Sequence, residues 1–194
     1  LGCQVISVED ITKYPSILEG RVKTLHPKIF GGILSKRGEK SNLEDVKKYD
    51  IPNFDLVIVD LYPFEDTVKS NASEDEIIEK IDIGGISLIR AAAKNFKDVL
   101  IIPAKELIPK CIDILQKKNG KTSLEERLFF AKKAFEISSN YDTHIFSWFN
   151  NSNSDKLQIS ISESKTLRYG ENPHQKGLYY GKLNEIFTQL NGKE

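Results

Sequence analysis

The sequence lacks methionine altogether and contains only two cysteines, three histidines and one tryptophan among its 194 residues. Cys3 and Cys111 stand alone, without the spacing of a metal site or a disulfide framework, so we expect two buried, reduced thiols. The 28 basic and 28 acidic side chains cancel, and no net field favours nucleic acid or a membrane surface. The longest apolar runs are too short to span a bilayer, and no secretory signal is recognisable. We therefore expect a cytoplasmic protein that binds neither nucleic acid nor membranes.

Leu1 stands where a methionine would begin a reading frame, which predicts a fragment or a processed product. What the chain does contain is ordinary for a globular protein, with 39% hydrophobic and 29% charged residues. Its length suffices for one compact core and the beginning of a second unit. Because the net charge is zero, any anionic ligand must be held by local geometry.

Short apolar runs alternate with helical patterns along the chain. CQVISV, FDLVIVDL and DVLIIP predict strands, and the last two are continuous runs, as in strands buried on both faces. Helices are expected over residues 73–81, 85–95, 104–120 and 123–150, two of them opened by Ser-to-Glu capping boxes. This alternation predicts an α/β fold with a mainly parallel sheet flanked by helices. Ligands of such sheets lie beyond the carboxyl ends of the strands, so the loop DLYPFE is a candidate ligand loop.

The polar run from Asn150 to Lys156 predicts a linker. Beyond it, LQISIS predicts a strand and LRYGENPHQKG a structured loop rich in hydrogen-bonding groups. We place a domain boundary here, between a first domain at residues 1–151 and the beginning of a second α/β domain at residues 152–194. The second segment is too short for a core of its own.

The segment GRVKTLHPKIFGGIL gathers basic side chains next to glycines. Arg21 offers a fork of donors, Lys23 a mobile charge and Thr24 a hydroxyl, a set that suits a sugar phosphate. The alternative is a solvated basic loop. Lys28 is assigned to the surface in either case.

Three further residues carry two interpretations each. Tyr62 follows a predicted strand, and it either donates to an oxyanion or covers the loop as a rim aromatic. Asp82 precedes two glycines, and it either acts as acid or base or caps the following helix. Lys94 at the far end either takes part in chemistry or only complements the helix dipole.

Five blocks in order, GRVKTLHPKIFGGIL, DLYPF, IDIGG, AAAKN and RYGENPHQ, closely resemble the bifunctional purine biosynthesis family. That family joins an IMP cyclohydrolase domain to an AICAR transformylase domain. The resemblance runs from about Ser7 to Gln175, nearly the whole chain.

The resemblance implies a methylglyoxal-synthase-like cyclohydrolase domain. This domain closes formylated aminoimidazole carboxamide ribotide to IMP with loss of water, and it needs no metal or organic cofactor. The implied catalytic residues are Lys94 and Asp82 for proton transfer, with Lys23 and Tyr62 stabilising the formyl oxygen. The implied substrate contacts are Arg21, Val22, Lys23, Thr24, Val59, Asp60, Asp82, Ile83 and Gly84.

For the transformylase, the resemblance implies ribotide contacts at Arg168 and Tyr169 and 10-formyltetrahydrofolate as co-substrate. It also implies that the family's phosphate loops precede Leu1 and that the transformylase lysine–histidine pair follows Glu194. We therefore expect the chain to be inactive alone. The implied partners are purine ribonucleotide intermediates and a second copy of the protein in a homodimer.

Two features of this sequence do not fit the family pattern directly. Asp60 stands where the family usually has asparagine. Asp82 and Lys94 are 12 positions apart, which is about 18 Å along a continuous helix. Three arrangements would allow both side chains to line one pocket: the helix start is irregular, the helix is bent, or one side chain reaches another subunit's site. We expect an irregular start through Gly84 and Gly85.

Two other functions are compatible with parts of the pattern. An allosteric module of the same fold that senses a phosphorylated metabolite accounts for Arg21 to Thr24 but not for LRYGENPHQ. A catalytically inactive dimerisation scaffold is the second alternative.

Overall fold

The computed structural model describes residues 2–150, 156–161, 163–172, 174–188 and 190–191. The chain divides into two compact units, Leu1–Ser138 and Ser139–Glu194, and the division falls within a long helix, α8. The predicted linker and the domain boundary at residue 151 lie largely outside the described residues, so that boundary stays a prediction.

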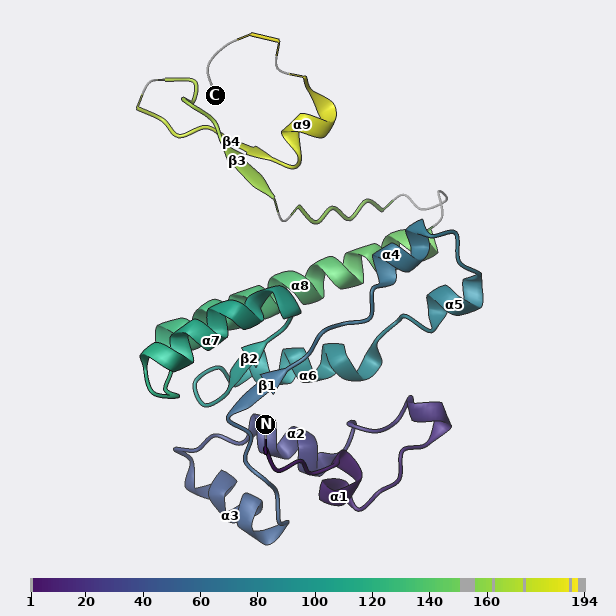
Figure 1. Ribbon diagram of the computed structural model, residues 1–194, viewed down its shortest axis with the longest axis vertical. Helices are drawn as coiled ribbons and strands as arrows, with labels where there is room; N and C mark the ends of the chain where they lie inside the picture. The colour runs from purple at the N-terminus through teal and green to yellow at the C-terminus, as the bar shows by residue number, and fades with distance from the viewer. Residues whose placement is uncertain (1, 151–155, 162, 173, 189, 192–194) are drawn as a thin grey trace. The chain divides into compact units, whose positions relative to one another are not determined.

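The first unit is an α/β structure around one pair of parallel strands (Figure 1). Its elements are α1 (Val8–Thr12), η1 (Leu18–Gly20), α2 (Pro27–Leu34), α3 (Lys40–Lys48), β1 (Leu56–Ile58), α4 (Phe64–Lys69), α5 (Glu74–Ile78), α6 (Ile83–Lys94), β2 (Leu100–Ile102), η2 (Lys105–Leu107), α7 (Ile108–Lys117) and the first half of α8 (Leu124–Asn150). The parallel pairing and the flanking helices confirm the predicted fold class.

The core lies between the strand pair and the helices packed on it. β2 is buried along its whole length, as its continuous apolar run predicts. Ile89 and Ala92 of α6, Ile33 of α2 and Phe130 of α8 complete the same apolar cluster. In Figure 1, α7 and α8 run on one side of the strands and α2 on the other. The core therefore holds α2 and α6 in fixed places relative to the strand ends.

Several sequence signals are borne out at the helix ends. Ser73 and Glu76 form a complete capping box at the start of α5, and Ser123 and Glu126 exchange the same two bonds before α8. The chain leaves α7 through Gly120, whose φ of +77° suits glycine.

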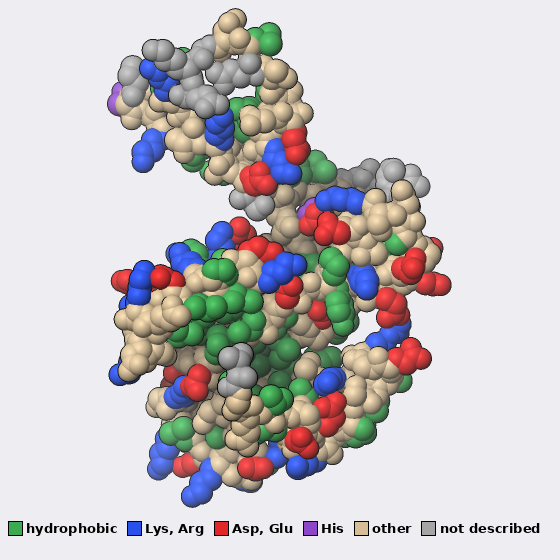
Figure 2. Space-filling model, in the orientation of Figure 1, with side chains coloured by type: hydrophobic (Ala, Val, Ile, Leu, Met, Phe, Trp, Pro, Cys, Tyr) green, Lys and Arg blue, Asp and Glu red, His purple; other side chains and the backbone are tan. Residues whose placement is uncertain are grey.

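Two strand predictions are wrong, and a third is confirmed only in part. CQVISV is not a strand: Val5 is 88% exposed, and α1 begins at Val8. Cys3 is therefore exposed, contrary to expectation, whereas Cys111 is buried. LQISIS forms no strand over its described residues 157–161. β1 is shorter than FDLVIVDL and is buried on one face only, because Leu56 and Ile58 are exposed. Apolar, β-branched sequence needs a partner edge to become a strand, and in the described parts β1 and β2 pair only with each other. Apolar side chains accordingly gather on the face of this unit shown in Figure 2.

The second unit contains an antiparallel pair, β3 (Ser164–Thr166) and β4 (Leu178–Tyr180), followed by α9 (Leu183–Ile186). LRYGENPHQKG connects the two strands. The backbone N–H of Gly170 donates to the Gln175 carbonyl at 3.0 Å, and that of Leu167 donates to the Gly177 carbonyl at 2.9 Å. The predicted structured loop is therefore confirmed for its described residues.

Candidate functional site

The carboxyl ends of β1 and β2 meet through the residues that follow them. The Val59 N–H donates to the Ile102 carbonyl at 3.0 Å, extending the ladder past β1. The Asp60 carboxylate accepts the Lys105 backbone N–H at 3.3 Å and lies 3.7 Å from the Lys105 ammonium. Asp60, the departure from the usual asparagine, thus has a cationic neighbour in this chain. The predicted ligand edge of the sheet is formed by these loops.

Tyr62 lies on the same edge, next to the connection between α5 and α6. It is exposed, and the Lys80 ammonium lies 5.7 Å from the centre of its ring. A cation at that distance is attracted to the ring face. The loop after β1 is therefore adjacent to the residues that lead into α6.

Asp82 begins α6 as its N-cap. One oxygen of its carboxylate accepts the Gly85 N–H at 2.6 Å, and the side chain is half-buried. The capping interpretation from the sequence is confirmed. Its role as acid or base stays a prediction. Ile83, the first residue of the helix, is exposed beside it.

The basic segment is held next to the first turn of α6. Ile17 and Val22 form a two-way backbone bridge across a tight turn whose residues Leu18 to Gly20 all have positive φ. This bridge presents the residues that follow it. The Thr24 hydroxyl lies so close to Gly84 that a Cβ on the glycine would be 3.1 Å from it. The structure therefore brings Thr24 together with Gly84 and the Asp82 cap.

The three cations of the basic segment, Arg21, Lys23 and Lys28, are each paired with a carboxylate. Arg21 forms an ion pair with Glu79, three positions before Asp82, and both side chains are largely exposed. The Lys23 ammonium lies 3.3 Å from the Glu9 carboxylate. Glu9's own backbone N–H, and then the Lys23 ammonium, lower the pKa of the Glu9 carboxyl. Lys28 pairs with Asp50 at 2.9 Å, and its side chain is only 24% exposed, so it is less exposed than its surface assignment predicts.

Lys94 is not brought to Asp82 within this chain. α6 starts at Ile83, directly after Asp82, and runs without interruption to Lys94, so the expected irregular start through Gly84 and Gly85 is wrong. Both glycines lie within the helix, and the Asp82 carboxylate accepts one of the free N–H groups of its first turn, that of Gly85. At 1.5 Å per residue, the cap and Lys94 are about 18 Å apart along the axis.

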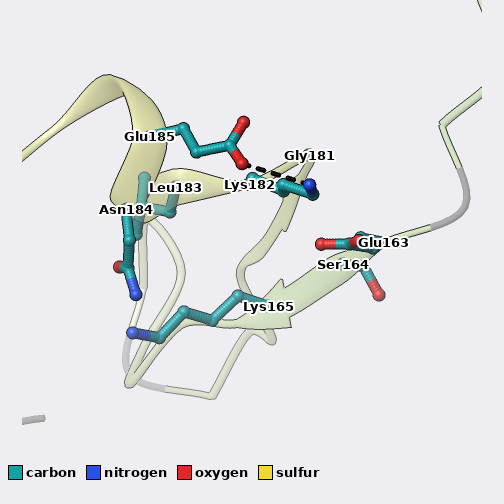
Figure 3. Close-up of a pocket in the computed structure, with 8 residues that line it drawn as sticks. All are labelled: Glu163, Ser164, Lys165, Gly181, Lys182, Leu183, Asn184 and Glu185. Atoms are coloured by element: carbon teal, nitrogen blue, oxygen red, sulfur yellow. Dashed lines mark ion pairs between the residues drawn. The ribbon is translucent and has the colours of Figure 1, made fainter. Parts of the chain in front are cut away.

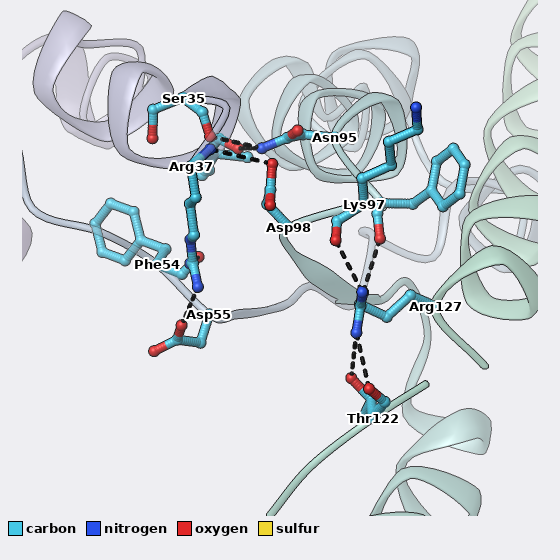
Figure 4. Close-up of polar contacts among 11 residues, drawn as sticks. Ser35, Arg37, Phe54, Asp55, Asn95, Lys97, Asp98, Thr122 and Arg127 are labelled. Carbon is cyan, nitrogen blue, oxygen red and sulfur yellow. Dashed lines mark hydrogen bonds and ion pairs between the residues drawn. The ribbon is translucent and has the colours of Figure 1, made fainter. Parts of the chain in front are cut away.

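The end of α6 that carries Lys94 is anchored by its neighbours (Figure 4). The buried Asn95 amide donates to the carbonyls of Ile33 and Ser35, at 2.8 and 3.0 Å, where α2 ends. Arg127 donates to the Phe96 and Lys97 carbonyls from α8. Lys94 is itself exposed. Its backbone is thus fixed while its side chain faces outward.

Arg168 and Tyr169 belong to the second unit, in the loop between β3 and β4. Tyr169 is 68% exposed, and its carbonyl approaches Gly177 so closely that a Cβ there would lie 2.8 Å away. A cavity of about 300 Å³ in this unit is lined by Glu163, Ser164, Lys165 and Gly181–Glu185 (Figure 3). It includes the Lys182–Glu185 ion pair and neither predicted ribotide contact.

Sequence reasoning missed the partners of the predicted residues. Glu79 pairs with Arg21, Lys105 pairs with Asp60, and the Lys80 ammonium lies over the Tyr62 ring. Glu79 and Lys80 also line an open cavity of about 430 Å³ between α4 and α5. The one local signal was that Glu79 and Lys80 directly precede IDIGG.

In the described part of the chain, no three His, Cys, Asp or Glu side chains are grouped as a metal site would require. None of the helices in the described residues combines the length and apolar character that a membrane crossing needs.

Comparison with known proteins gives two family matches. The model of the MGS-like domain matches residues 1–87, and the model of the AICARFT/IMPCHase bienzyme matches residues 92–194. The methylglyoxal-synthase-like fold of the first unit is thereby confirmed.

Individual relatives agree with these matches. The bifunctional purine biosynthesis protein PurH of Bacteroides thetaiotaomicron is 56% identical over 194 residues, which is all of this chain and 38% of the relative. The protein of the same name from Clostridioides difficile is 46% identical over 202 residues, covering all of this chain and 39% of its own length. The chain thus spans about two fifths of these relatives.

A solved structure titled "Crystal structure of ForH" superposes with a TM-score of 0.63 at 34% identity, covering 79% of each chain. With the family models and the two PurH relatives, this likeness places the whole length of the chain in one family. The chain belongs to the AICARFT/IMPCHase bienzyme family.

Proposed function

We propose that the protein containing this chain closes formylated aminoimidazole carboxamide ribotide to IMP with loss of water. The contact between Thr24 and Gly84 carries the proposal, because it joins the basic segment to the turn that holds Asp82. A nucleotide whose phosphate is held at Arg21 and Thr24 would then extend its base toward Asp82. The reaction is intramolecular, so positioning the amine against the formyl carbon supplies much of the rate.

In this proposal the base rests on the loops at the strand ends, against Val59, Asp60, Asp82, Ile83 and Gly84, while Val22 lines the phosphate end. Lys23 and Tyr62 donate to the formyl oxygen as negative charge develops on it. Asp82 takes part in moving the amine proton toward the departing water. No metal or organic cofactor is required for this step.

We further propose that Lys94 acts in the site of a partner subunit in a homodimer. The helix between Asp82 and Lys94 is uninterrupted, so an irregular start does not bring the two residues together. The exposed Lys94 side chain faces outward from an anchored backbone. If Lys94 reaches the site of a second copy, both groups can act in one pocket without a bend in α6.

The second activity we propose is formyl transfer from 10-formyltetrahydrofolate to AICAR, with Arg168 and Tyr169 contacting the ribotide. The bienzyme family match over residues 92–194 and the word "bifunctional" in the relatives' names support it. A cytoplasmic enzyme acting on purine ribonucleotide intermediates fits both activities. The sensor alternative is disfavoured because LRYGENPHQ falls within that match.

The test supplies formylated ribotide to the protein encoded by the complete reading frame and follows IMP by its ultraviolet absorbance. Asp82→Ala and Lys94→Ala should each lower turnover strongly, whereas Lys28→Ala, which removes the ion pair with the exposed Asp50, should not. Binding of IMP without any turnover in the unaltered protein would support the sensor instead.

Mixing the two inactive variants tests the shared site. If Lys94 acts in the partner's pocket, each mixed dimer has one intact site, and random re-pairing restores about a quarter of the activity. If both residues act within one chain, no mixed dimer has an intact site, and activity stays at the level of the variants.

A further inference from the structure

We propose that Gly85 is a positioning residue for Asp82, because the absence of a Cβ at position 85 leaves room for the Asp82 carboxylate. The effect of this positioning on catalysis rests on the proposed cyclisation. A Cβ built on Gly85 would lie 2.3 Å from Asp82 Oδ2, 2.8 Å from Cγ and 2.9 Å from Oδ1. The carboxylate thus occupies the space that any other residue at position 85 would need.

Backbone conformation does not explain this glycine. Gly85 lies inside α6 and is absent from the residues with positive φ, so any L-residue could adopt its conformation. In a helix, glycine is also less favourable than alanine. The reason for glycine at this position is therefore the space next to it.

Capping alone does not require glycine either, because three other caps in this chain have the same spacing. Ser7, Ser73 and Ser123 accept the backbone N–H of the third residue onward at 3.0, 3.4 and 3.2 Å, and those third residues are Asp10, Glu76 and Glu126. Each carries a full side chain. At Asp82 the acceptor distance is 2.6 Å, and all three carboxylate atoms lie within 2.9 Å of the position that a Cβ on Gly85 would take.

The two adjacent glycines serve different partners. A Cβ on Gly84 would approach the Thr24 hydroxyl at 3.1 Å, whereas the three atoms nearest to a Cβ on Gly85 would all belong to the Asp82 carboxylate. Ordinary contact begins at 3.4 Å, so a side chain at position 85 displaces the nearer carboxylate oxygen by about 1 Å. A displacement of that size re-aims the group that the proposed reaction uses for proton transfer.

The catalytic test compares Gly85→Ala with Gly38→Ala, whose added Cβ meets nothing within 4 Å, in the protein from the complete reading frame. Gly85→Ala should lower kcat for cyclisation roughly tenfold to a hundredfold, with a smaller change in KM, since misplacement of about 1 Å has effects of that order. Gly38→Ala should leave both constants unchanged. An unchanged kcat in Gly85→Ala would overturn the positioning role.

A thermal double-mutant cycle tests the steric claim without reference to activity. In the wild-type background Gly85→Ala should leave Tm within about 3 °C or lower it, because the gain in helix propensity opposes the loss of the cap. In the Asp82→Ala background the clash is gone, and the same change should raise Tm. Equal Tm shifts in the two backgrounds would refute the proposal. If the shifts differ but the unaltered protein forms no IMP, the proposed function fails while the assigned role of Gly85 in seating the carboxylate stands.

Discussion

Replacing Asn95 by alanine should detach the end of α6 from the end of α2. Asn95 is 7% exposed, and its amide donates to the carbonyls of Ile33 and Ser35 at 2.8 and 3.0 Å. The Ile33 carbonyl belongs to a residue that is 2% exposed, in the last turn of α2, where no later helical N–H follows. The Asn95 amide thus supplies hydrogen bonds to carbonyls at a helix end that water does not readily reach.

The size of the effect follows from those two bonds. Each neutral hydrogen bond contributes about 1 kcal/mol net, and a buried carbonyl left unpaired costs about 1–3 kcal/mol. Asn95→Ala should therefore lower the free energy of unfolding by about 2–4 kcal/mol, whereas Asn53→Ala, at an exposed asparagine, should change it by less than about 0.5 kcal/mol. Equilibrium urea unfolding followed by far-ultraviolet circular dichroism measures both. A loss under about 0.5 kcal/mol for Asn95→Ala would refute the anchoring role.

Asn95→Asp sharpens the same test. An ionised carboxylate cannot donate to two carbonyls, whereas a protonated one can donate to one of them. The introduced carboxyl should therefore have a raised pKa in the folded state, and this variant should lose stability as the pH rises. Its unfolding midpoint should lie below that of Asn95→Ala at neutral pH. A midpoint equal to that of the wild type at neutral pH would contradict the assigned donor geometry.

Two further predictions concern charged pairs. Glu79→Gln removes the carboxylate that pairs with Arg21, and because an exposed ion pair contributes about 0–1 kcal/mol, IMP affinity measured by calorimetry should rise by up to about fivefold. A weaker affinity would show that Glu79 does not compete with the ligand. The Lys118 ammonium, and then the Ser123 N–H, lower the pKa of Glu126 below 4.5, so its contribution to stability is present above pH 4.5 and is lost as the pH falls below it. Urea midpoints measured on acidification should fall less steeply for Glu126→Gln than for the wild type, and parallel curves would contradict this assignment.

The sequence predicted correctly those features that depend on residues a few positions apart. The capping boxes at Ser73 and Ser123, the buried run of β2 and the Asp82 cap depend on short spacings, and each is found in the structure. The candidate ligand loop after β1 also lies where parallel-sheet geometry puts it.

The remaining features depend on contacts between distant positions. CQVISV has β-strand composition, but a strand also requires a neighbouring edge, and in the described residues none lies beside it. Arg21 and Glu79 are 58 positions apart, so their pairing follows from the fold and not from any local pattern. The candidate site residues could therefore be proposed from the sequence, whereas the partners that hold them in place, such as Glu79, could not.

We propose above that the basic segment and the first turn of α6 form two walls of one nucleotide site. A crystal structure of the protein from the complete reading frame with IMP tests this most directly. We predict the phosphate at Arg21 and Thr24, the base against Asp82 to Gly84, and a partner subunit's lysine, equivalent to Lys94, in the same pocket. IMP bound away from Thr24 and Gly84, with the phosphate out of reach of Arg21, would contradict the account.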